Sequence, residues 1–379
     1  MAEGDNSISG AHPAGDEASF SVTTTTDGKL LNTVRQRLVV VACWRLNEGV
    51  FEFDSSFVGP QIAPDLELLA SVAKDNPKAP ASVFGHADPT GEDAYNKTLS
   101  GRRALAIYGL LVRDTAIWED LQTNPFQGDR WSLKSTQTAL AHVRGSDGSP
   151  FYRGSIDGKE GPLTENAVKD FQKANGLTAD GDAGPTTRKV LFLKYMDSLS
   201  TPNGRFVMSK AAFLDGGADP DLRRACQGCG EFNPVRLIEA SAQTDKKGPD
   251  ALRDLRNASN RRVMLFFFRP GTVVTASEWP CPSVKEGPSR CRLQFWPDGD
   301  VRRKPGSVER NYASDRKTMA CRFYDRFARV SPCEGISPLA ASRFGDTAVI
   351  GPGDSSSSST GGDDDQATLP AQLGVSRGP

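Results

Sequence analysis

The stretch Gly85–Ala104 reads GHADPTGEDAYNKTLSGRRA and is dense in side chains that could hold a charged ligand. Asp88 lies in its loop. Asn96, Leu99 and Arg103 follow at spacings of three and four residues, which puts them on one stripe of a helix. The Arg103 guanidinium can fork onto a carboxylate, and the Asp88 carboxylate can accept hydrogen bonds from an ammonium group.

Two simpler explanations exist for these residues. Asp88 could serve only as a turn residue, and Arg103 could pair with a neighbouring acid at the surface. A plain connector, however, needs only two to six residues of turn chemistry, and this stretch carries many more polar groups. We therefore predict a binding site here.

The apolar pattern predicts the elements that must position these residues. A short apolar run, Ala81–Phe84, predicts a buried strand that ends at the loop, and a long helix is expected over Asp93–Val112. Pro64 suits the first turn of a helix over Pro64–Lys74. Further strands are expected over Leu38–Trp44, Val50–Phe53, 228–235 and 260–268.

Residues 132–198 contain an internal repeat. The sequences IDGKEGPLT (156–164) and ADGDAGPTT (179–187) share the pattern xDGxxGPxT at a spacing of 23 residues. In each copy Asp-Gly makes a turn, and Gly-Pro places proline in the first turn of a helix, where its missing N–H costs nothing. Together with a first helix around Leu133–Val143, the repeat predicts a three-helix unit.

The loop and helix around Asp88 resemble the OmpA-like peptidoglycan-binding domain of the OmpA C-terminal, Pal and MotB superfamily. Ala87 stands where this family usually has threonine, which removes a hydroxyl group from the loop. The last two strands of the family find their match only far downstream, in GCGEFNPV (228–235) and NRRVML (260–265). The upstream matches are FEFDSS (51–56), Gly85-His86-Ala87-Asp88, Gly91, Tyr95-Asn96, Leu99-Ser100 and Arg102-Arg103-Ala104.

This resemblance implies an α+β fold in which an OmpA-like mixed α/β sandwich is discontinuous, over 38–116 and 205–269. It also implies the ligand, the diaminopimelate of the peptidoglycan stem peptide, which offers an amine and a carboxylate on one carbon. On the matching positions, Asp88 would accept the amine and Arg103 would bind the carboxylate. Asn96 and Leu99 would lie between them, and Asp54, at the end of the first strand, would join them.

The three-helix unit at 132–198 resembles a second family, the peptidoglycan-binding domain common in cell-wall hydrolases (PG_binding_1-like). This unit would be an all-α insert within the OmpA-like domain. Two unrelated modules that resemble binders of one polymer support each other. The matching residues are Gly154–Gly158, Gly161, Thr164, Ala167-Val168, Phe171-Gln172, Gly176-Leu177, Asp180-Gly181 and Gly184-Pro185.

The remaining segments carry weaker patterns. Residues 1–30 predict a flexible N-terminal arm, residues 270–345 a small cysteine-containing extension, and residues 352–379 a disordered tail. Four of the seven cysteines are Cys281, Cys291, Cys321 and Cys333. They could form two local disulfides or a zinc site, although their gaps are wide for zinc. We expect disulfides in an oxidising compartment and reduced thiols otherwise.

Composition limits the classes of function. The chain has 379 residues and a net charge of −1, and no apolar run approaches the roughly 18 residues of a membrane helix. The three histidines all lie at or before position 142, which leaves zinc amidase and Cys–His peptidase chemistry in the C-terminal half unsupported. Basic residues in 201–350 are scattered, so we expect a solvated surface and no nucleic-acid partner.

We therefore expect a non-catalytic protein of the cell envelope that binds peptidoglycan and uses no cofactor or metal. A cell-wall hydrolase is one alternative, because the inserted module often accompanies such enzymes. A component or cargo of a secretion or contractile injection apparatus, with a protein partner in the envelope, is the other. No classical signal peptide is visible at the start of the sequence, so the sequence predicts no export route.

Overall fold

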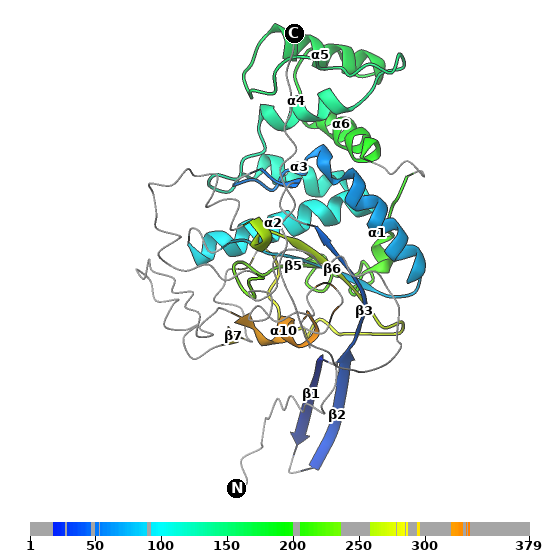
Figure 1. The fold of residues 1–379 in the computed structure, drawn as a ribbon, viewed down its shortest axis with the longest axis vertical. Coiled ribbons are helices and arrows are strands. Elements are labelled where there is room, and N and C mark those ends of the chain that lie inside the picture. The colour runs from blue at the N-terminus through cyan, green and yellow to red at the C-terminus, as the bar shows by residue number, and fades with distance from the viewer. Residues whose placement is uncertain are drawn as a thin grey trace, which may run out of the picture. The chain divides into compact units, whose positions relative to one another are not determined.

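A four-stranded sheet forms the centre of the structure, a computed structural model that describes residues 18–26, 29–46, 50–52, 54–88, 92–199, 205–235, 258–277, 279–284, 286, 294–295, 320–328, 331 and 333. Its strands are β3 (Val40–Leu46), β4 (Ala81–Gly85), β5 (Cys226–Gly228) and β6 (Val263–Phe268). They lie in the order β3-β6-β4-β5 (Figure 1). β6 is antiparallel to both of its neighbours, and β5 is parallel to β4.

Both faces of this sheet are buried. Alternate residues from Val263 to Phe267 join one apolar cluster, and those from Met264 to Phe268 join the other. The alternation follows from the pleat of a strand, whose successive side chains point to opposite faces. A strand that is buried on both faces is apolar throughout, which is why the run VMLFFF predicted a strand from the sequence.

Two helices, α1 (Ala63–Asp75) and α2 (Asp93–Val112), cover one face of the sheet (Figure 1). They confirm the predicted helices, α2 with the same bounds. Glycine lets α2 lie close to the end of β4: a Cβ at Gly85 would be 2.0 Å from the carbonyl oxygen of Ser100. This close approach brings the loop after β4, which carries Asp88, next to the first turns of α2.

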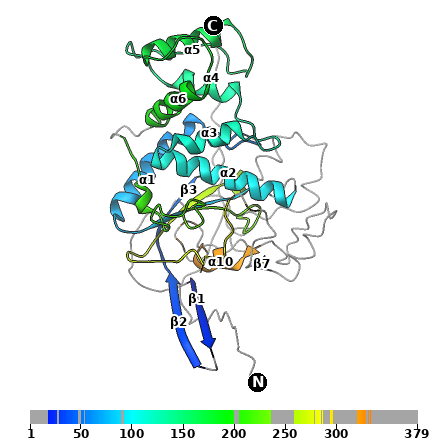
Figure 2. The same cartoon turned by 180° about the vertical axis from the view of Figure 1, so that it is seen from behind.

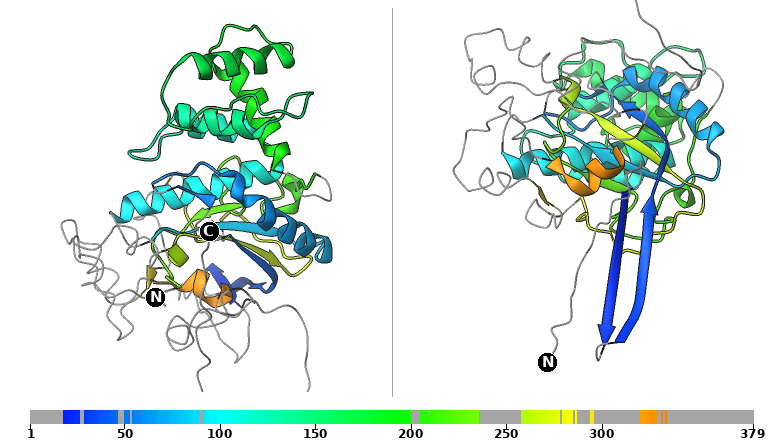
Figure 3. Two further views of the ribbon diagram at one scale, coloured as in Figure 1. Left: turned by 45° about the horizontal axis from the view of Figure 1, so that its top comes forward. Right: turned by 60° about the horizontal axis from the view of Figure 1, so that its bottom comes forward.

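The C-terminal extension covers the opposite face. Its helix α10 (Arg322–Ala328) lies on the side of the sheet away from α2 (Figures 1 and 3). Phe327 of α10 packs 5.5 Å from Phe84 of β4, measured between ring centroids. The described aromatic residues of the extension thus join one apolar cluster with the sheet; they are Trp279, Phe323, Tyr324 and Phe327. A short ladder of β7 (Gln294–Phe295) and β8 (Ala320–Cys321) precedes the helix.

A disulfide ties the extension to the sheet. Cys333 bonds to Cys43 of β3, 290 residues away, with the Cα atoms 6.1 Å apart. The expected local pairing of Cys333 is therefore wrong. Spacing alone cannot give disulfide connectivity, and here the partner comes from the other end of the chain. Cys291 lies outside the described residues.

Three further helices, α4 (Leu133–His142), α5 (Pro162–Ala174) and α6 (Pro185–Ser198), form the predicted three-helix unit. A buried glutamine holds each copy of its repeat. Gln137 Nε2 donates to Asp157 Oδ1 and to Thr164 Oγ1, each at 3.1 Å. Gln172 makes the equivalent contacts in the second copy, at 2.7 and 3.0 Å. The Asp and Thr of the repeat are thus fixed by a shared partner on the preceding helix.

This unit shares one continuous core with α1, α2, α3 and the face of the sheet that they cover. Helix α3 (Thr115–Thr123) lies between α2 and the unit (Figure 2). Trp118 of α3 packs 5.5 Å from Phe192 of α6, and Phe57 stacks on Tyr195 at 5.7 Å. The Tyr195 hydroxyl donates to the carbonyl of Val58 at 2.9 Å. The three-helix unit is therefore packed against the rest of the domain and is not joined to it by a linker alone.

The described residues depart from the sequence predictions in three places. A hairpin of β1 (Ala18–Thr26) and β2 (Lys29–Leu38) replaces much of the expected flexible arm 1–30. The sequence carries the signal for it, a run of Val and Thr followed by Asp27-Gly28. The strand expected over Val50–Phe53 is only a bridge between Phe51 and Val58. The strand expected over 228–235 is β5, which ends at Gly228. The tail 352–379 lies outside the described residues.

Candidate functional site

Arg103 forms the centre of the predicted site. Its side chain leaves α2 and is buried, with 2% of the residue exposed. Nε donates to the carbonyl of Ser55 at 2.9 Å, and the guanidinium lies 5.3 Å from the centroid of the Phe51 ring. Within the described part of the chain, Nη1 makes no hydrogen bond. Burial lowers the pKa of Arg103 to about 10, against the opposing effect of Asp88, so the group is charged at neutral pH.

Asp88 lies in the loop directly after β4 and is 6% exposed. Its Oδ2 accepts from Arg261 Nη1 at 2.8 Å, in an ion pair whose side chains are 8% exposed at Asp88 and 12% exposed at Arg261. Arg261 precedes β6, the strand next to β4, and so brings a second guanidinium to the same place. Both Asp88 and Arg261 act on the charge of Arg103.

Asp54 approaches from the segment before α1. Its backbone has a φ of 57°, the left-handed region. Its carboxylate fills the space beside Gly128, where an added Cβ would lie 1.6 Å from Asp54 Oδ2. Burial and the nearby Asp129 raise the pKa of Asp54, and Arg103 opposes them. The carboxylate is thus within the electrostatic reach of Arg103.

Asn96 and Leu99 lie on the same stripe of α2 as Arg103, as the spacing predicts, and both are buried. Asn96 Nδ2 donates to Glu231 Oε2 at 3.2 Å. The structure therefore brings Asp54, Asp88 and Arg103 together with Arg261 as one charged group. It places Asn96 against the loop after β5 and Leu99 in the packing of α2.

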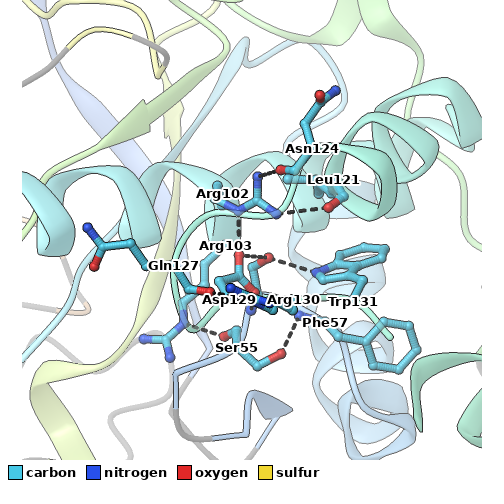
Figure 4. A network of polar contacts seen from close by, with 11 residues as sticks. Ser55, Phe57, Arg102, Arg103, Leu121, Asn124, Gln127, Asp129, Arg130 and Trp131 are labelled. Atoms are coloured by element: carbon cyan, nitrogen blue, oxygen red, sulfur yellow. Dashed lines mark hydrogen bonds and ion pairs between the residues drawn. The ribbon is translucent and has the colours of Figure 1, made fainter. Parts of the chain in front are cut away.

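A network of hydrogen bonds holds the segment beside Asp54 (Figure 4). Asp129 accepts from the backbone N of Ser56 at 2.7 Å and from its hydroxyl at 2.6 Å. Arg102 pairs with Asp129 and also donates to the carbonyls of Leu121 and Asn124 at 2.9 and 2.8 Å. Arg102 is therefore structural, in contrast to its neighbour Arg103.

His86 holds the loop through a contact with the backbone. Its Nδ1 lies 3.0 Å from the carbonyl of Phe232. Burial lowers the pKa of His86 well below its usual value, and the charge of Arg262 acts in the same direction, so the ring is neutral. Among the described residues, no three His, Cys, Asp or Glu side chains are grouped so as to hold a metal ion.

Sequence reasoning missed three residues of this region: Glu231, Arg261 and Asp129. The first two stand in the motifs that carried the family resemblance, GCGEFNPV and NRRVML, but those motifs indicated strands and not side-chain partners. Asp129 stands in NPFQGD (124–129), which is typical of a turn. Its long-range contact with Ser56 leaves no local signal.

Two family models match parts of the chain. Residues 50–142 match the OmpA family, and residues 133–191 match a peptidoglycan binding domain. These matches confirm both resemblances drawn from the sequence.

Outer membrane proteins are similar to a shorter part of the chain. Outer membrane porin F of Pseudomonas aeruginosa is 40% identical over 67 residues, and that of Pseudomonas fluorescens is 42% identical over 64 residues. Outer membrane protein 41 of Porphyromonas gingivalis is 33% identical over 91 residues. The matched parts are 18%, 17% and 22% of this chain. They are 19%, 20% and 23% of these relatives, so the chain spans only a small share of their length.

Proposed function

We propose that this protein binds bacterial peptidoglycan without cleaving it, and that the site around Arg103 holds the diaminopimelate of the stem peptide. The observation that carries the proposal is the buried Arg103 guanidinium, whose Nη1 has no hydrogen-bond partner in the described part of the chain. A buried donor left without a partner costs free energy. A ligand carboxylate at this position would supply the missing acceptor.

The charges around Arg103 suit a zwitterion. Asp54 and Asp88 face Arg103 and Arg261, so the group is neutral as a whole. The free end of diaminopimelate adds one charge of each sign, and the occupied site stays neutral. In our proposal Arg103 binds the carboxylate of the ligand, and Asp88 and Asp54 accept hydrogen bonds from its ammonium group. Arg261 then gives up part of its contact with Asp88.

Asn96 and Leu99 have a supporting part in the proposal. Asn96 donates one N–H to Glu231, and this hydrogen bond connects α2 to the loop after β5. Leu99 is 5% exposed and packs on the same stripe as Arg103. We propose that the two residues form the floor on which the ligand lies between Asp88 and Arg103.

The sheet supports a discontinuous OmpA-like domain. β5 and β6 follow the three-helix unit in the sequence, yet they pair with β4, which precedes it. We propose that the domain spans 38–116 and 205–269, and that 132–198 is a second wall-binding module inserted into it. The family match at 133–191 supports that second module.

Two observations support a location in the cell envelope, in the periplasm or the peptidoglycan layer. The similar relatives are named outer membrane proteins. The disulfide between Cys43 and Cys333 fits an oxidising compartment. No helix among the described residues is long and apolar enough to cross a bilayer.

The test uses the full chain, because the continuous core makes removal of 132–198 destructive. Calorimetry would compare a soluble stem peptide ending in meso-diaminopimelate with the same peptide ending in lysine, which lacks the second carboxylate. We expect the first to bind more tightly, and Arg103→Ala and Asp88→Ala to lose this preference. Arg113→Ala is the matched control, since it removes a buried guanidinium from the other end of the same helix, where Arg113 pairs with Asp197.

Equal binding of the two peptides, or an unchanged preference in Arg103→Ala, would contradict the site. Pelleting with insoluble peptidoglycan measures the two modules together, so a sacculus assay alone does not test Arg103. Release of soluble muropeptides from digested sacculi would contradict the non-catalytic part of the proposal.

A further inference from the structure

The segment 124–131, between α3 and α4, connects the three-helix unit to the rest of the chain and also lies against the Arg103 site. Asp129 is its innermost residue, with no exposed surface. Phe126 of the same segment stacks on Tyr95 of α2, with ring centroids 5.5 Å apart and planes 14° apart. The segment is therefore packed on the helix that carries Arg103.

Asp129 and Arg103 bind neighbouring residues at one peptide group, Arg103 at the Ser55 carbonyl and Asp129 at Ser56. Arg103 Nε donates to the carbonyl of Ser55, and Asp129 accepts from both the backbone and the hydroxyl of Ser56. The position of the Ser55 carbonyl thus depends on Asp129. That carbonyl is the hydrogen-bond acceptor of the Arg103 guanidinium, and a displaced acceptor would leave the guanidinium free to turn.

The three-helix unit also contacts Ser56, through Trp131. Trp131 Nε1 donates to the Ser56 hydroxyl at 2.9 Å. The Trp131 ring packs on Phe57 at 5.1 Å and on Phe192 of α6 at 6.0 Å. These contacts run from α6 through Trp131 to Ser56, the residue next to the Ser55 carbonyl that accepts from Arg103.

We propose that Asp129 is a positioning residue of the ligand site. Through Asp129 and Trp131, the docked three-helix unit fixes the orientation of the Arg103 guanidinium. The inference rests on the proposed function. Diaminopimelate and lysine differ by one carboxylate. A guanidinium discriminates between them only if it is held in the orientation that lets it hydrogen-bond to that carboxylate. Asp129 is then a determinant of selectivity, although it does not touch the ligand.

The experiment measures the ratio of the Kd values for the lysine and the diaminopimelate peptide in the full chain. Asp129→Asn keeps the shape of the side chain and removes the charge that pairs with Arg102 and binds Ser56. We expect the ratio to fall about tenfold, the effect of one charge-assisted hydrogen bond. Glu119→Gln is the matched control, since Glu119 also joins two parts of the chain, through a partly buried pair with Arg188 at 2.5 Å, but contacts neither serine.

Ser56→Ala is the second variant, since it removes only a hydroxyl. It tests the same contact if Asp129→Asn does not fold. It should lower the ratio about threefold, a smaller effect than that of Asp129→Asn because the backbone N of Ser56 keeps its hydrogen bond to Asp129. An unchanged ratio in the folded variants overturns the inference, even if both peptides bind more weakly, because general destabilisation moves both Kd values together. An equal fall in Glu119→Gln also overturns it. If the wild-type protein does not discriminate between the peptides, the proposed function fails and the inference fails with it.

Discussion

Removal of the disulfide between Cys43 and Cys333 should destabilise the protein strongly. The bond closes a loop of 290 residues, so it restricts most of the unfolded chain. In the chain-entropy relation, a loop of this size corresponds to about 5–6 kcal/mol at 25 °C. Because measured values usually fall below this relation, we expect a loss of about 3–5 kcal/mol in the free energy of unfolding.

Urea unfolding, followed by tryptophan fluorescence, would measure this loss. The oxidised protein is compared with the same protein in reductant, and the double variant Cys43→Ala/Cys333→Ala serves as the control. We expect reductant to lower the midpoint of the wild type and to leave that of the variant unchanged. If reductant leaves the wild-type midpoint where it is, the bond does not hold the extension on the sheet. An equal effect of reductant on the variant would assign the loss to other cysteines.

Three further predictions follow from the site and the core. Burial raises the pKa of Asp54 above 3.8, so Asp54 becomes protonated and the diaminopimelate peptide should bind more weakly as the pH falls through that raised value. In Asp54→Asn, the affinity should no longer fall over this pH range. Gly85→Ala should cost about 3 kcal/mol of stability in urea unfolding, because its Cβ would overlap a carbonyl of α2, whereas Gly161→Ala, with nothing within 4 Å, should be neutral. Tyr195→Phe should cost about 1–2 kcal/mol, since it leaves the buried carbonyl of Val58 without its hydroxyl donor; an unchanged midpoint would show that this contact does not hold the three-helix unit.

Local patterns predicted the parts of the fold that local physics determines. The helix over Asp93–Val112 and the apolar strand VMLFFF carry their own periodicity, and the repeat xDGxxGPxT carries its own turns. The stripe of Asn96, Leu99 and Arg103 follows from helical spacing alone. These predictions needed no knowledge of what packs against them.

The remaining parts depend on contacts between distant residues. Arg261 meets Asp88 across 173 positions, and Asp129 meets Ser56 across 73. No periodicity or turn signal near any of these residues indicates its partner. The sequence could therefore identify the groups that we propose to bind a ligand, but not the charged and polar residues that pair with them and fix their positions.

The neutral pairing of the site gives a physical reason for selectivity. Asp88 and Arg103 are both buried, so each must keep a partner of opposite charge or hydrogen-bonding character while a ligand enters. A ligand with an ammonium but no carboxylate could engage Asp88, but it would leave Arg103 Nη1 without the acceptor that it also lacks among the described residues. A ligand carboxylate would give this buried charge its acceptor, and a hydrogen bond to a charged group contributes about 1.5–3 kcal/mol. We therefore propose that the site favours a head group with both charges, because only such a group supplies an acceptor to Arg103 and a donor to Asp88 at once.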